Sequence, residues 1–351
     1  MTKKILIIGC EGYLGSRLSD YLINKKKYYV EGIDVGYFKN CNIYRTKFFK
    51  IKKKNARRIT NQDIKNFDVV IQLAAFSNDP LDRLKPKEFY KPTRDYTFKI
   101  AKICKTLNKK FIFPSSCSVY GYGNILFREN SKTNPITFYS KNKLEIEKDL
   151  IKLENKNFKP IILRLATVFG ISPRLRFDVV INMLCGMAFT KKKIILNSNG
   201  LAWRPHVYID DVCCIIEFFV NVNISQHKKI LFNVGQNINN CKVIDIVKII
   251  KKYLPDTVVE FANKKNVDIK EIFLDKKIKD GVDRRSYRVS FNKLKRIFPR
   301  ALIKYSLDKG IKKFIKDLKL LKISKKIFES KKFYRLQKLS EIKKKFPERF
   351  K

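Results

Sequence analysis

Three side chains, Ser116, Tyr139 and Lys143, are of the types that move a proton to or from an alcohol. Tyr139 and Lys143 stand four positions apart, so on a helix they share one face. A tyrosine that acts as a base near neutral pH must have its pKa lowered from about 10, and a lysine ammonium beside it favours that change. A serine hydroxyl can orient the alcohol and relay its proton. We predict that these three residues are catalytic, against the alternative that Tyr139 and Lys143 are surface residues of a basic helix.

Glycines at positions 9, 12 and 15 form a Gly-x-x-Gly-x-x-Gly loop between an apolar segment and a helical pattern. Residues 5–8 are typical of a buried parallel strand, and residues 13–23 have helical periodicity. In a dinucleotide-binding loop the first glycine allows a tight turn, the second lets the backbone approach a pyrophosphate, and the third lets the helix pack closely. The helix N-terminus then faces the phosphates. We expect this loop to bind a dinucleotide.

Asp34 ends a second predicted strand, residues 29–34, about 20 residues after the glycine loop. A carboxylate there accepts hydrogen bonds from ribose hydroxyls and repels a 2′-phosphate, so the sequence favours NAD over NADP. Residues 67–75 and 111–113 are two more predicted core strands, and the second leads into Ser116. Ligands of open α/β sheets bind at the carboxyl ends of the strands, where Ser116 is expected. The pattern predicts an α/β fold with a Rossmann-type, doubly wound parallel sheet.

From Lys4 to about Ile315 the chain resembles the extended short-chain dehydrogenase/reductase family, in particular its NAD-dependent nucleotide-sugar epimerase/dehydratase branch. The resemblance is carried by the loop Gly9–Gly15, Asp34, Leu73-Ala74-Ala75, Ser115 to Gly121, Tyr139-x-x-x-Lys143, Arg164 to Gly170, Arg204 to Val212 and Asp283 to Tyr287. It implies an N-terminal domain that binds NAD and a smaller C-terminal α/β domain that binds a nucleotide-diphosphate sugar. By the same resemblance, Tyr139 is the base, Lys143 its partner and Ser116 the hydroxyl that handles the proton.

The resemblance also implies which residues contact the two ligands. The expected cofactor-binding residues are Gly9, Gly12, Tyr13, Leu14, Gly15, Asp34, Asn55, Ala56, Leu73, Ala74, Ala75, Thr93, Tyr139 and Lys143. The expected substrate-binding residues are Ser116, Tyr139, Thr167, Arg176, Arg204 and Arg285. Since an arginine fork matches phosphate oxygens, Arg174 is a further candidate partner of the substrate diphosphate.

The chain departs from the family pattern at four places. The 4,6-dehydratase relatives carry Thr-Asp-Glu where this chain has Ser116-Cys117-Ser118, so the acid and base that eliminate water are missing and a dehydratase is disfavoured. Asn55 replaces a frequent Asp beside the adenine, and its amide oxygen can accept the same hydrogen bond. Thr167 replaces an asparagine that galactose-type epimerases use near the substrate, which leaves the sugar open. Thr93 replaces a frequent asparagine.

We expect residues 1–170 to form the NAD-binding domain, with residues 207–232 returning to it. Residues 171–206 and 233–315 are expected to form the substrate domain. Residues 316–351 are lysine-rich, contain scattered aromatic residues and have helical spacing of their apolar positions. They predict a basic helical tail that wraps the body or supports self-association.

The formal net charge of the 351 residues is +46, from 78 Lys and Arg against 32 Asp and Glu. A charge of this size attracts polyanions at low salt. The lysines are spread through every segment rather than gathered in one basic region, so we expect no specific nucleic-acid partner. An anionic nucleotide sugar gains from the same electrostatic field.

The eight cysteines include no Cys-x-x-Cys pair, and His206 and His227 have no zinc-binding spacing, so we expect no metal site. The apolar run of residues 5–8 is shorter than the roughly 7–15 residues of an export signal. No apolar stretch reaches the roughly 18 residues of a membrane span. We expect a cytoplasmic protein without a membrane span, and a homodimer.

These features predict an NAD-dependent nucleotide-sugar epimerase that acts through a transient keto sugar. A keto-sugar reductase or dehydrogenase of the same family, which consumes NAD(P)H, is the first alternative. A non-catalytic nucleotide- or nucleic-acid-binding protein on the same fold is the second, and the presence of Ser116, Tyr139 and Lys143 speaks against it.

Overall fold

A seven-stranded parallel sheet forms the centre of the computed structural model, which describes residues 2–76, 86–224, 226–227, 230–262 and 285–346. From one edge to the other, the strands are β11 (Leu231–Val234), β7 (Ile161–Leu165), β5 (Lys110–Ser116), β4 (Val69–Gln72), β1 (Lys3–Ile8), β2 (Tyr28–Asp34) and β3 (Lys50–Lys53). The strand order reverses at β1, as in a doubly wound sheet. The predicted fold class and the four predicted core strands are confirmed.

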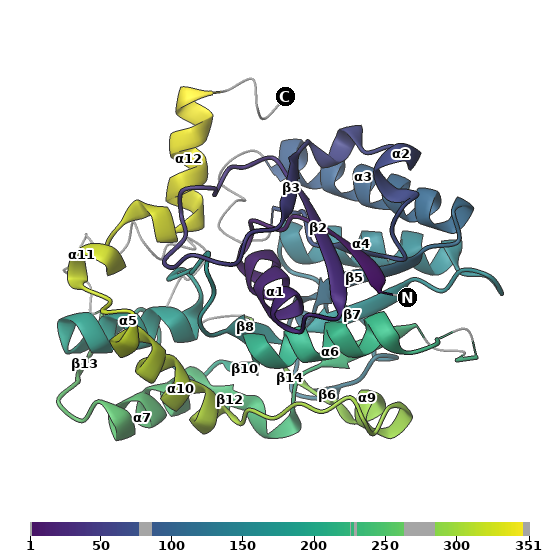
Figure 1. Ribbon diagram of the computed structural model, residues 1–351. Helices are drawn as coiled ribbons and strands as arrows, with labels where there is room; N and C mark the ends of the chain where they lie inside the picture. Colours follow the sequence, from purple (N-terminus) through teal and green to yellow (C-terminus); the bar gives the residue numbers. More distant parts are fainter. Residues whose placement is uncertain (1, 77–85, 225, 228–229, 263–284, 347–351) are drawn as a thin grey trace.

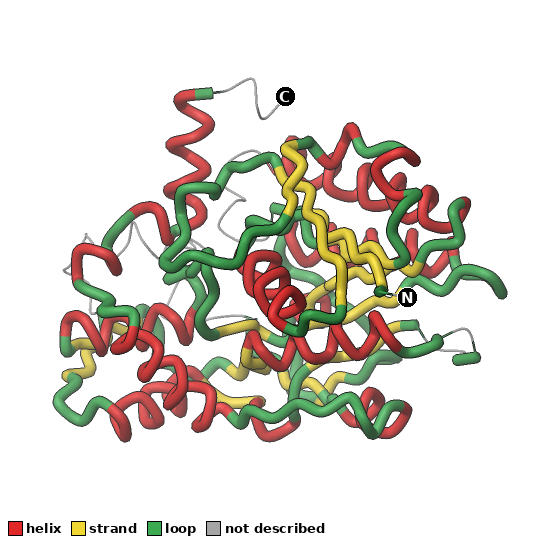
Figure 2. Tube along the Cα trace, in the orientation of Figure 1, coloured by secondary structure: helices red, strands yellow, loops and turns green. Residues whose placement is uncertain are grey.

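Helices cover both faces of this sheet (Figures 1 and 2). One face carries α1 (Tyr13–Asn24) and α6 (Ile209–Asn221), and the other carries α3 (Pro86–Thr106) and α4 (Phe138–Leu153), with the short α2 (Asn61–Ile64) beside α3. The predicted helices after the glycine loop and at Tyr139 are therefore present.

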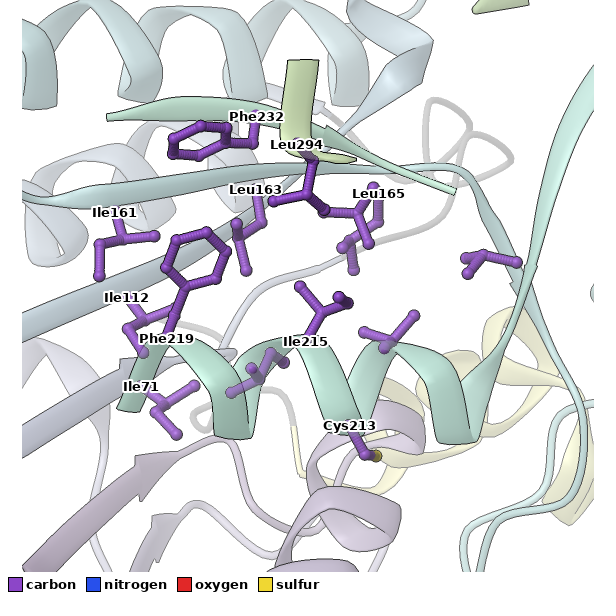
Figure 3. Packing of buried hydrophobic residues seen from close by; sticks show 14 of the residues in the cluster. Ile71, Ile112, Ile161, Leu163, Leu165, Cys213, Ile215, Phe219, Phe232 and Leu294 are labelled. Carbon is purple, nitrogen blue, oxygen red and sulfur yellow. The ribbon is translucent and has the colours of Figure 1, made fainter. Parts of the chain in front are cut away.

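Alternate residues of the strands enter the cores on the two faces. Ile5 and Ile7 pack in the core under α1 and α6, whereas Leu6 and Ile8 pack in the core under α3 and α4. Figure 3 shows Ile215 and Phe219 of α6 lying against the strand residues of the first core, and the Phe219 and Phe232 ring centroids are 5.4 Å apart. Burial on both faces explains why the strands are continuous apolar runs.

Within the described residues, three small sheets accompany the large one. They consist of β8 (Thr167–Phe169), β10 (Trp203–Tyr208) and β12 (Asn240–Lys242); β9 (Lys193–Leu196) and β13 (Val258–Phe261); and β6 (Leu126–Phe127) and β14 (Arg288–Val289). The helices here are α5 (Val180–Lys191), α7 (Val243–Tyr253), α9 (Asn292–Ile297) and α10 (Leu307–Leu320). The described loops also contain the short 3₁₀ helices η1 (Ala56–Arg58), η3 (Cys117–Tyr120), η4 (Asn237–Asn239) and η7 (Lys331–Phe333). Between β10 and β12 the chain returns to the large sheet through α6 and β11.

The C-terminal segment contains short helices and packs on the body. After α10 come α11 (Lys325–Phe328), η7 and α12 (Arg335–Lys345). The centroid of the Phe177 ring lies 4.8 Å from that of the Phe328 ring and 6.0 Å from that of the Phe333 ring. In Figure 1, α12 stands beside the loop that follows β2, and Leu339 packs with Phe38 of that loop.

Candidate active site

Two adjoining cavities lie at the carboxyl ends of the central strands, where ligands of open α/β sheets bind. The larger cavity, of about 520 Å³, is bordered by the predicted residues Gly9, Gly12, Tyr13, Leu14, Gly15, Leu73, Ala75, Ser116, Tyr139, Lys143, Thr167, Arg176, Arg204 and Arg285. The smaller one, of about 110 Å³, is bordered by the predicted residues Asp34, Asn55, Ala56 and Ala74. Both cavities are bordered by Gly9, Gly12, Leu73, Ala75 and Arg335. The fold thus brings predicted cofactor- and substrate-binding residues from distant parts of the sequence together around these two cavities.

The glycine loop joins β1 to α1 in a conformation that side chains would prevent. Gly9 has φ of +90°, and a Cβ there would lie 2.4 Å from the backbone nitrogen of Ala74. A Cβ at Gly15 would lie 2.1 Å from the carbonyl oxygen of Gly9. Gly12 is the N-cap of α1 and no side chain caps the helix, so its first N–H groups are available to an anion. The loop therefore fits a diphosphate.

Asp34 holds the loop on the side of the smaller cavity. Its carboxylate accepts hydrogen bonds from the backbone N–H groups of Glu11 and Gly36, both at 3.0 Å. Burial raises the pKa of Asp34 above its usual range, although these two N–H groups and Arg335 oppose the shift. Burial, followed by the charge of Asp34, also raises the pKa of Glu11 to about 7. Two acidic groups therefore stand where a 2′-phosphate of NADP is expected.

Asn55 and Thr93 use their side chains within the protein. The Asn55 side chain caps η1 by accepting a hydrogen bond from the N–H of Arg57 at 3.0 Å. Thr93 accepts a hydrogen bond from the Tyr96 hydroxyl at 3.2 Å and borders neither cavity. Tyr96 borders the smaller cavity and donates to the carbonyl oxygen of Ala74 at 2.9 Å. Thr93 thus stands behind Tyr96 rather than beside the predicted cofactor site.

A capping box starts α4 immediately before Tyr139. The Thr137 hydroxyl accepts from the N–H of Ser140 at 3.2 Å, and the Ser140 hydroxyl accepts from the N–H of Thr137 at 3.1 Å. These reciprocal hydrogen bonds satisfy the first turn of the helix. Tyr139 and Lys143 are consequently on one face of a regular helix and border the same cavity.

Lys143 is buried in a position that disfavours the charged form of its amine. Its Nζ donates to the carbonyl oxygen of Pro114 at 2.8 Å and lies 4.3 Å from the centroid of the Phe113 ring. Burial lowers the pKa of Lys143 to about 7. Burial therefore disfavours the ammonium form of Lys143, an effect that the spacing of Tyr139 and Lys143 in the sequence did not indicate. Arg176 and Arg335 are further cations that interact electrostatically with Tyr139.

Ser116 ends β5 and caps η3. Its hydroxyl oxygen accepts hydrogen bonds from the N–H of Ser118 at 3.2 Å and from the Ser118 hydroxyl at 2.9 Å. Ser116 is the acceptor in both contacts, which leaves its hydroxyl hydrogen for a partner in the cavity. Cys117, which follows it, is buried and donates to the carbonyl oxygen of Arg164 at 3.2 Å.

A buried ion pair that sequence reasoning missed fixes α4 on the sheet. Arg164 of β7 donates from Nη2 to a Glu147 carboxylate oxygen at 2.7 Å and from Nε to both carboxylate oxygens at 3.0 and 3.1 Å. Glu147 also accepts from the hydroxyl of Ser115, next to Ser116. Since Glu147 follows Lys143 by one helical turn, this network sets the position of the face of α4 that carries Tyr139 and Lys143. The Tyr-x-x-x-Lys-x-x-x-Glu spacing was the available signal.

The arginines of the substrate side have different surroundings. Arg176 forms a two-pronged ion pair with Asp178, with Nε–Oδ1 and Nη2–Oδ2 distances of 2.8 and 3.1 Å. Arg204 donates from Nη1 to the carbonyl oxygen of Trp203 at 2.9 Å and stacks over Tyr287 at 5.6 Å. Arg174 is buried, stacks over Phe38 at 4.3 Å and borders neither cavity. Its predicted contact with the substrate diphosphate is therefore wrong, because burial places the guanidinium in the core.

Four residues at the start of α12 also border the larger cavity, namely Tyr334, Arg335, Leu336 and Gln337. They lie in the segment for which the sequence indicated only a basic helix. Leu336 and Tyr139 both pack against the cluster of Phe38, Cys41, Tyr90 and Leu339, and both border the larger cavity, so the start of α12 lies at the same cavity as the predicted base. The helical spacing of Leu336 and Leu339 showed that this segment would pack, but it did not show where.

Within the ranges that the structure describes, no group of three or more His, Cys, Asp or Glu residues could hold a metal ion. No helix in those ranges is long and apolar enough to cross a membrane.

Comparison with known proteins identifies relatives of the chain. A curated relative, the bifunctional polymyxin resistance protein ArnA of Wigglesworthia glossinidia brevipalpis, is 26% identical over 71% of this chain, and the match spans only 41% of ArnA. The uncharacterized UDP-glucose epimerase YtcB of Bacillus subtilis is 29% identical over 59% of this chain and 69% of its own length.

The solved structures support the fold. The structure of a NAD-dependent NDP-hexosamine 5,6-dehydratase, TunA, involved in tunicamycin biosynthesis, superposes with a TM-score of 0.75 over 91% of this chain and 98% of its own. At 18% identity this similarity concerns the fold alone.

One family description matches more than half of the chain. Residues 5–235 match the NAD dependent epimerase/dehydratase family, whose members are enzymes that use NAD. The resemblance and the cofactor predicted from the motifs are thereby confirmed. The chain belongs to the NAD dependent epimerase/dehydratase family.

Proposed function

We propose that this protein is an epimerase of nucleotide-diphosphate sugars that acts through a transient keto sugar. The observation that carries the proposal is the joint position of Ser116, Tyr139 and Lys143 in a cavity that continues into the glycine loop. The absence of carboxylates at Cys117 and Ser118 supports an epimerase over a dehydratase, since elimination of water needs an acid and a base there.

The cofactor part of the site fits NAD. Gly9, Gly12 and the N-terminus of α1 would hold the diphosphate, and Asp34 would hold the adenosine ribose. Asn55 and Ala56 border the smaller cavity on the adenine side. When bound, NAD supplies the hydride acceptor and donor that a reversible oxidation of a sugar hydroxyl needs.

The protein residues handle the proton. Tyr139 takes the proton of the sugar hydroxyl, and Ser116 orients that hydroxyl through its own available hydrogen. The cations Arg176 and Arg335 stabilise the phenolate that Tyr139 forms when it acts as a base. Lys143 adds its charge when protonated and otherwise holds the helix against Pro114. Rotation of the keto sugar and its reduction from the opposite face would give the epimer.

The substrate part of the cavity is suited to an anion. Arg176, Arg204 and Arg285 border it together with Thr167, and guanidinium groups bind phosphate oxygens in two-pronged geometry. We therefore assign the nucleotide diphosphate to these arginines and the sugar to the space next to Ser116 and Tyr139.

The proposal includes a cytoplasmic location and a homodimer. All eight cysteines are free thiols, which suits a reducing compartment. Light scattering of the purified protein measures the assembly, and cell fractionation measures the location.

The test of the reaction is a screen of nucleotide sugars incubated with the purified protein and NAD. Mass spectrometry and NMR should detect an isomer of one nucleotide sugar without net production of NADH. Stoichiometric oxidation of NADH with a keto-sugar substrate would instead identify a reductase. If neither reaction occurs with any sugar while NAD binds, the protein is a binding protein and the proposal is wrong.

The variant Tyr139→Phe tests the assignment of the base. It removes one hydroxyl, so folding and NAD binding should persist while turnover falls on the order of 10²–10⁴-fold, the usual contribution of general acid–base catalysis. Tyr122→Phe is the matched control, because Tyr122 is exposed and borders neither cavity. Near-full turnover of Tyr139→Phe on the true substrate would rule out this mechanism.

A further inference from the structure

The C-terminal segment reaches the middle of the predicted cofactor site through a defined set of contacts. The carbonyl oxygen of Phe333 accepts a hydrogen bond from the N–H of Phe177 at 3.0 Å. Two residues later, the backbone N–H of Arg335 donates to the Asp178 carboxylate at 3.0 Å. The same carboxylate also binds Arg176. The backbone at the start of α12 is therefore attached to the wall of the active site.

The side chain of Arg335 extends from this point to the junction of the two cavities. Its Nη2 donates to the carbonyl oxygen of Ala75 at 3.0 Å, and its guanidinium lies 5.5 Å from the centroid of the Phe38 ring. The other residues that border both cavities are Gly9, Gly12, Leu73 and Ala75. The glycine loop is where a dinucleotide places its diphosphate, between adenosine on one side and nicotinamide on the other. Arg335 thus borders the same junction of the two cavities as the glycine loop.

The charges around Arg335 favour an anion at this junction. Burial and the nearby charges of Arg176 and Arg174 lower its pKa to about 9. Asp34, Asp178 and the Tyr139 phenol interact electrostatically with Arg335. Asp178 already binds Arg176 with both oxygens, and Asp34 accepts from two backbone N–H groups. A diphosphate would offset the mutual repulsion of the arginines.

We propose that Arg335 of the C-terminal segment is a ligand of the NAD diphosphate and closes the cofactor site from the side opposite the glycine loop. A planar guanidinium can bind two phosphate oxygens at once, which a backbone N–H cannot do. Because Leu336 of the same helix borders the larger cavity together with Tyr139, binding of the cofactor at Arg335 would also order the part of α12 that lies at the cavity of the predicted base. The assignment rests on the NAD-binding role of the glycine loop and not on the identity of the sugar.

Calorimetry on full-length Arg335→Gln tests the contact. Since hydrogen bonds between charged groups are stronger than neutral ones, the Kd for NAD should rise roughly ten- to hundredfold. Arg335→Lys keeps the positive charge but lacks the planar guanidinium, so its Kd for NAD should lie between those of the wild type and Arg335→Gln. Lys338→Gln is the matched control, because Lys338 lies on the same helix, pairs with Glu341 at 3.3 Å and borders neither cavity. It removes the same charge and should leave the Kd nearly unchanged.

Fragments of the cofactor locate the contact. ADP-ribose contains the diphosphate, and Arg335→Gln should weaken its binding about as much as that of NAD. Adenosine, measured by competition with NAD, should bind equally to both proteins. An equal loss for adenosine would overturn the assignment to the diphosphate. A lower affinity of Arg335→Gln for UDP, combined with an unchanged affinity for NAD, would also overturn this assignment, since Arg335 would then contact the substrate.

Thermal unfolding without NAD separates binding from a structural role. We expect Arg335→Gln to unfold at about the wild-type temperature without NAD and to gain less stability when NAD is added. A lower unfolding temperature combined with unchanged NAD affinity would show that Arg335 only holds α12 in place. Failure of the wild-type protein to bind NAD would contradict the proposed function itself. Equal NAD affinities of the wild type and Arg335→Gln would contradict only the role of Arg335.

Discussion

Lys143 combines two roles that oppose each other at the residue scale. Its contact with the carbonyl oxygen of Pro114 and its position over Phe113 fix the side chain in the wall of the cavity. The same burial lowers its pKa to about 7, because the charged form loses its hydration. Tyr139 therefore relies on Arg176 and Arg335 for part of the positive field around it.

The lowered pKa of Lys143 predicts a pH-dependent stability of the NAD-free protein. Between about pH 7 and about pH 10, an unfolded chain carries a proton on this lysine that the folded protein lacks. The free energy of unfolding should therefore rise with pH in this window, by up to ~1.4 kcal/mol per pH unit from this group. Urea denaturation of the wild type and of Lys143→Met gives the difference between their free energies of unfolding at each pH. This difference measures the contribution of Lys143, since the titration of the other groups contributes equally to both proteins. A difference that does not change between about pH 7.5 and 9 would contradict the buried position of the amine.

Asp34 determines a second prediction at this scale. We expect the protein to bind NAD at least ~10-fold more tightly than NADP, because burial of a 2′-phosphate beside a carboxylate costs more than the ~1.4 kcal/mol that this ratio requires. Asp34→Asn keeps an oxygen for the N–H groups of Glu11 and Gly36 but removes the charge, and should narrow the ratio. Glu31→Gln is the control, since Glu31 lies on the same strand and pairs with Lys50 at 3.2 Å outside both cavities. Equal calorimetric affinities of the wild type for NAD and NADP would refute the role of Asp34.

The position of α4 is the decisive property at the scale of elements. Its first turn is capped by Thr137 and Ser140, and its middle is held by the pair of Glu147 with Arg164. The Tyr120 hydroxyl accepts from Arg164 at 2.9 Å and donates to Asn233 at 2.8 Å, which extends the network to β11. Together with the contacts of Lys143 and Glu147 with β5, the helix is thus attached to three strands of the sheet, and Tyr139 is held with it.

Removal of one member of this network should destabilise the fold. Glu147→Gln leaves the buried Arg164 without its counterion, and loss of one partner of a buried pair costs on the order of 3–5 kcal/mol. Glu145→Gln on the same helix loses the solvent-exposed ion pairs of Glu145 with Lys148 and Arg94 and should cost at most about 1 kcal/mol. Urea denaturation gives both values. Equal stability of the two variants would mean that the Glu147–Arg164 pair is not buried in solution.

Electrostatic repulsion dominates at the scale of the whole molecule. With 78 basic and 32 acidic residues, the chain has a net charge of +46. The charges are spread over the fold, and the described acidic residues are mostly paired, as Glu217 is with Lys27 at 2.9 Å. A net charge of this size destabilises the compact state through self-repulsion.

This repulsion predicts that salt stabilises the protein. Raising NaCl from about 20 mM to about 300 mM shortens the screening length to below ~10 Å and should raise the thermal unfolding temperature, by on the order of a few degrees. Differential scanning calorimetry at constant pH measures the change. An unfolding temperature that falls as salt is added would show that attractive ion pairs outweigh the repulsion.

The sequence by itself determined the sheet, the order of its motifs and the face that carries Tyr139 and Lys143. Those features depend on local signals, because apolar strands, glycines that cannot carry a Cβ and residues one helical turn apart each act within a short segment. The family could be recognised for the same reason, since its motifs are contiguous.

Tertiary structure alone decided the surroundings of the charged residues. Nothing near Arg174 in the sequence distinguished it from Arg176, yet one lies in the core and the other borders the cavity. Arg335 meets the carbonyl oxygen of Ala75 across 260 positions of sequence. Burial and long-range contacts arise when distant segments pack together, and they set the pKa of Lys143, the partner of Glu147 and the position of α12 at the cavity of Tyr139. No local sequence pattern predicts these three properties, because each property depends on side chains from another part of the chain.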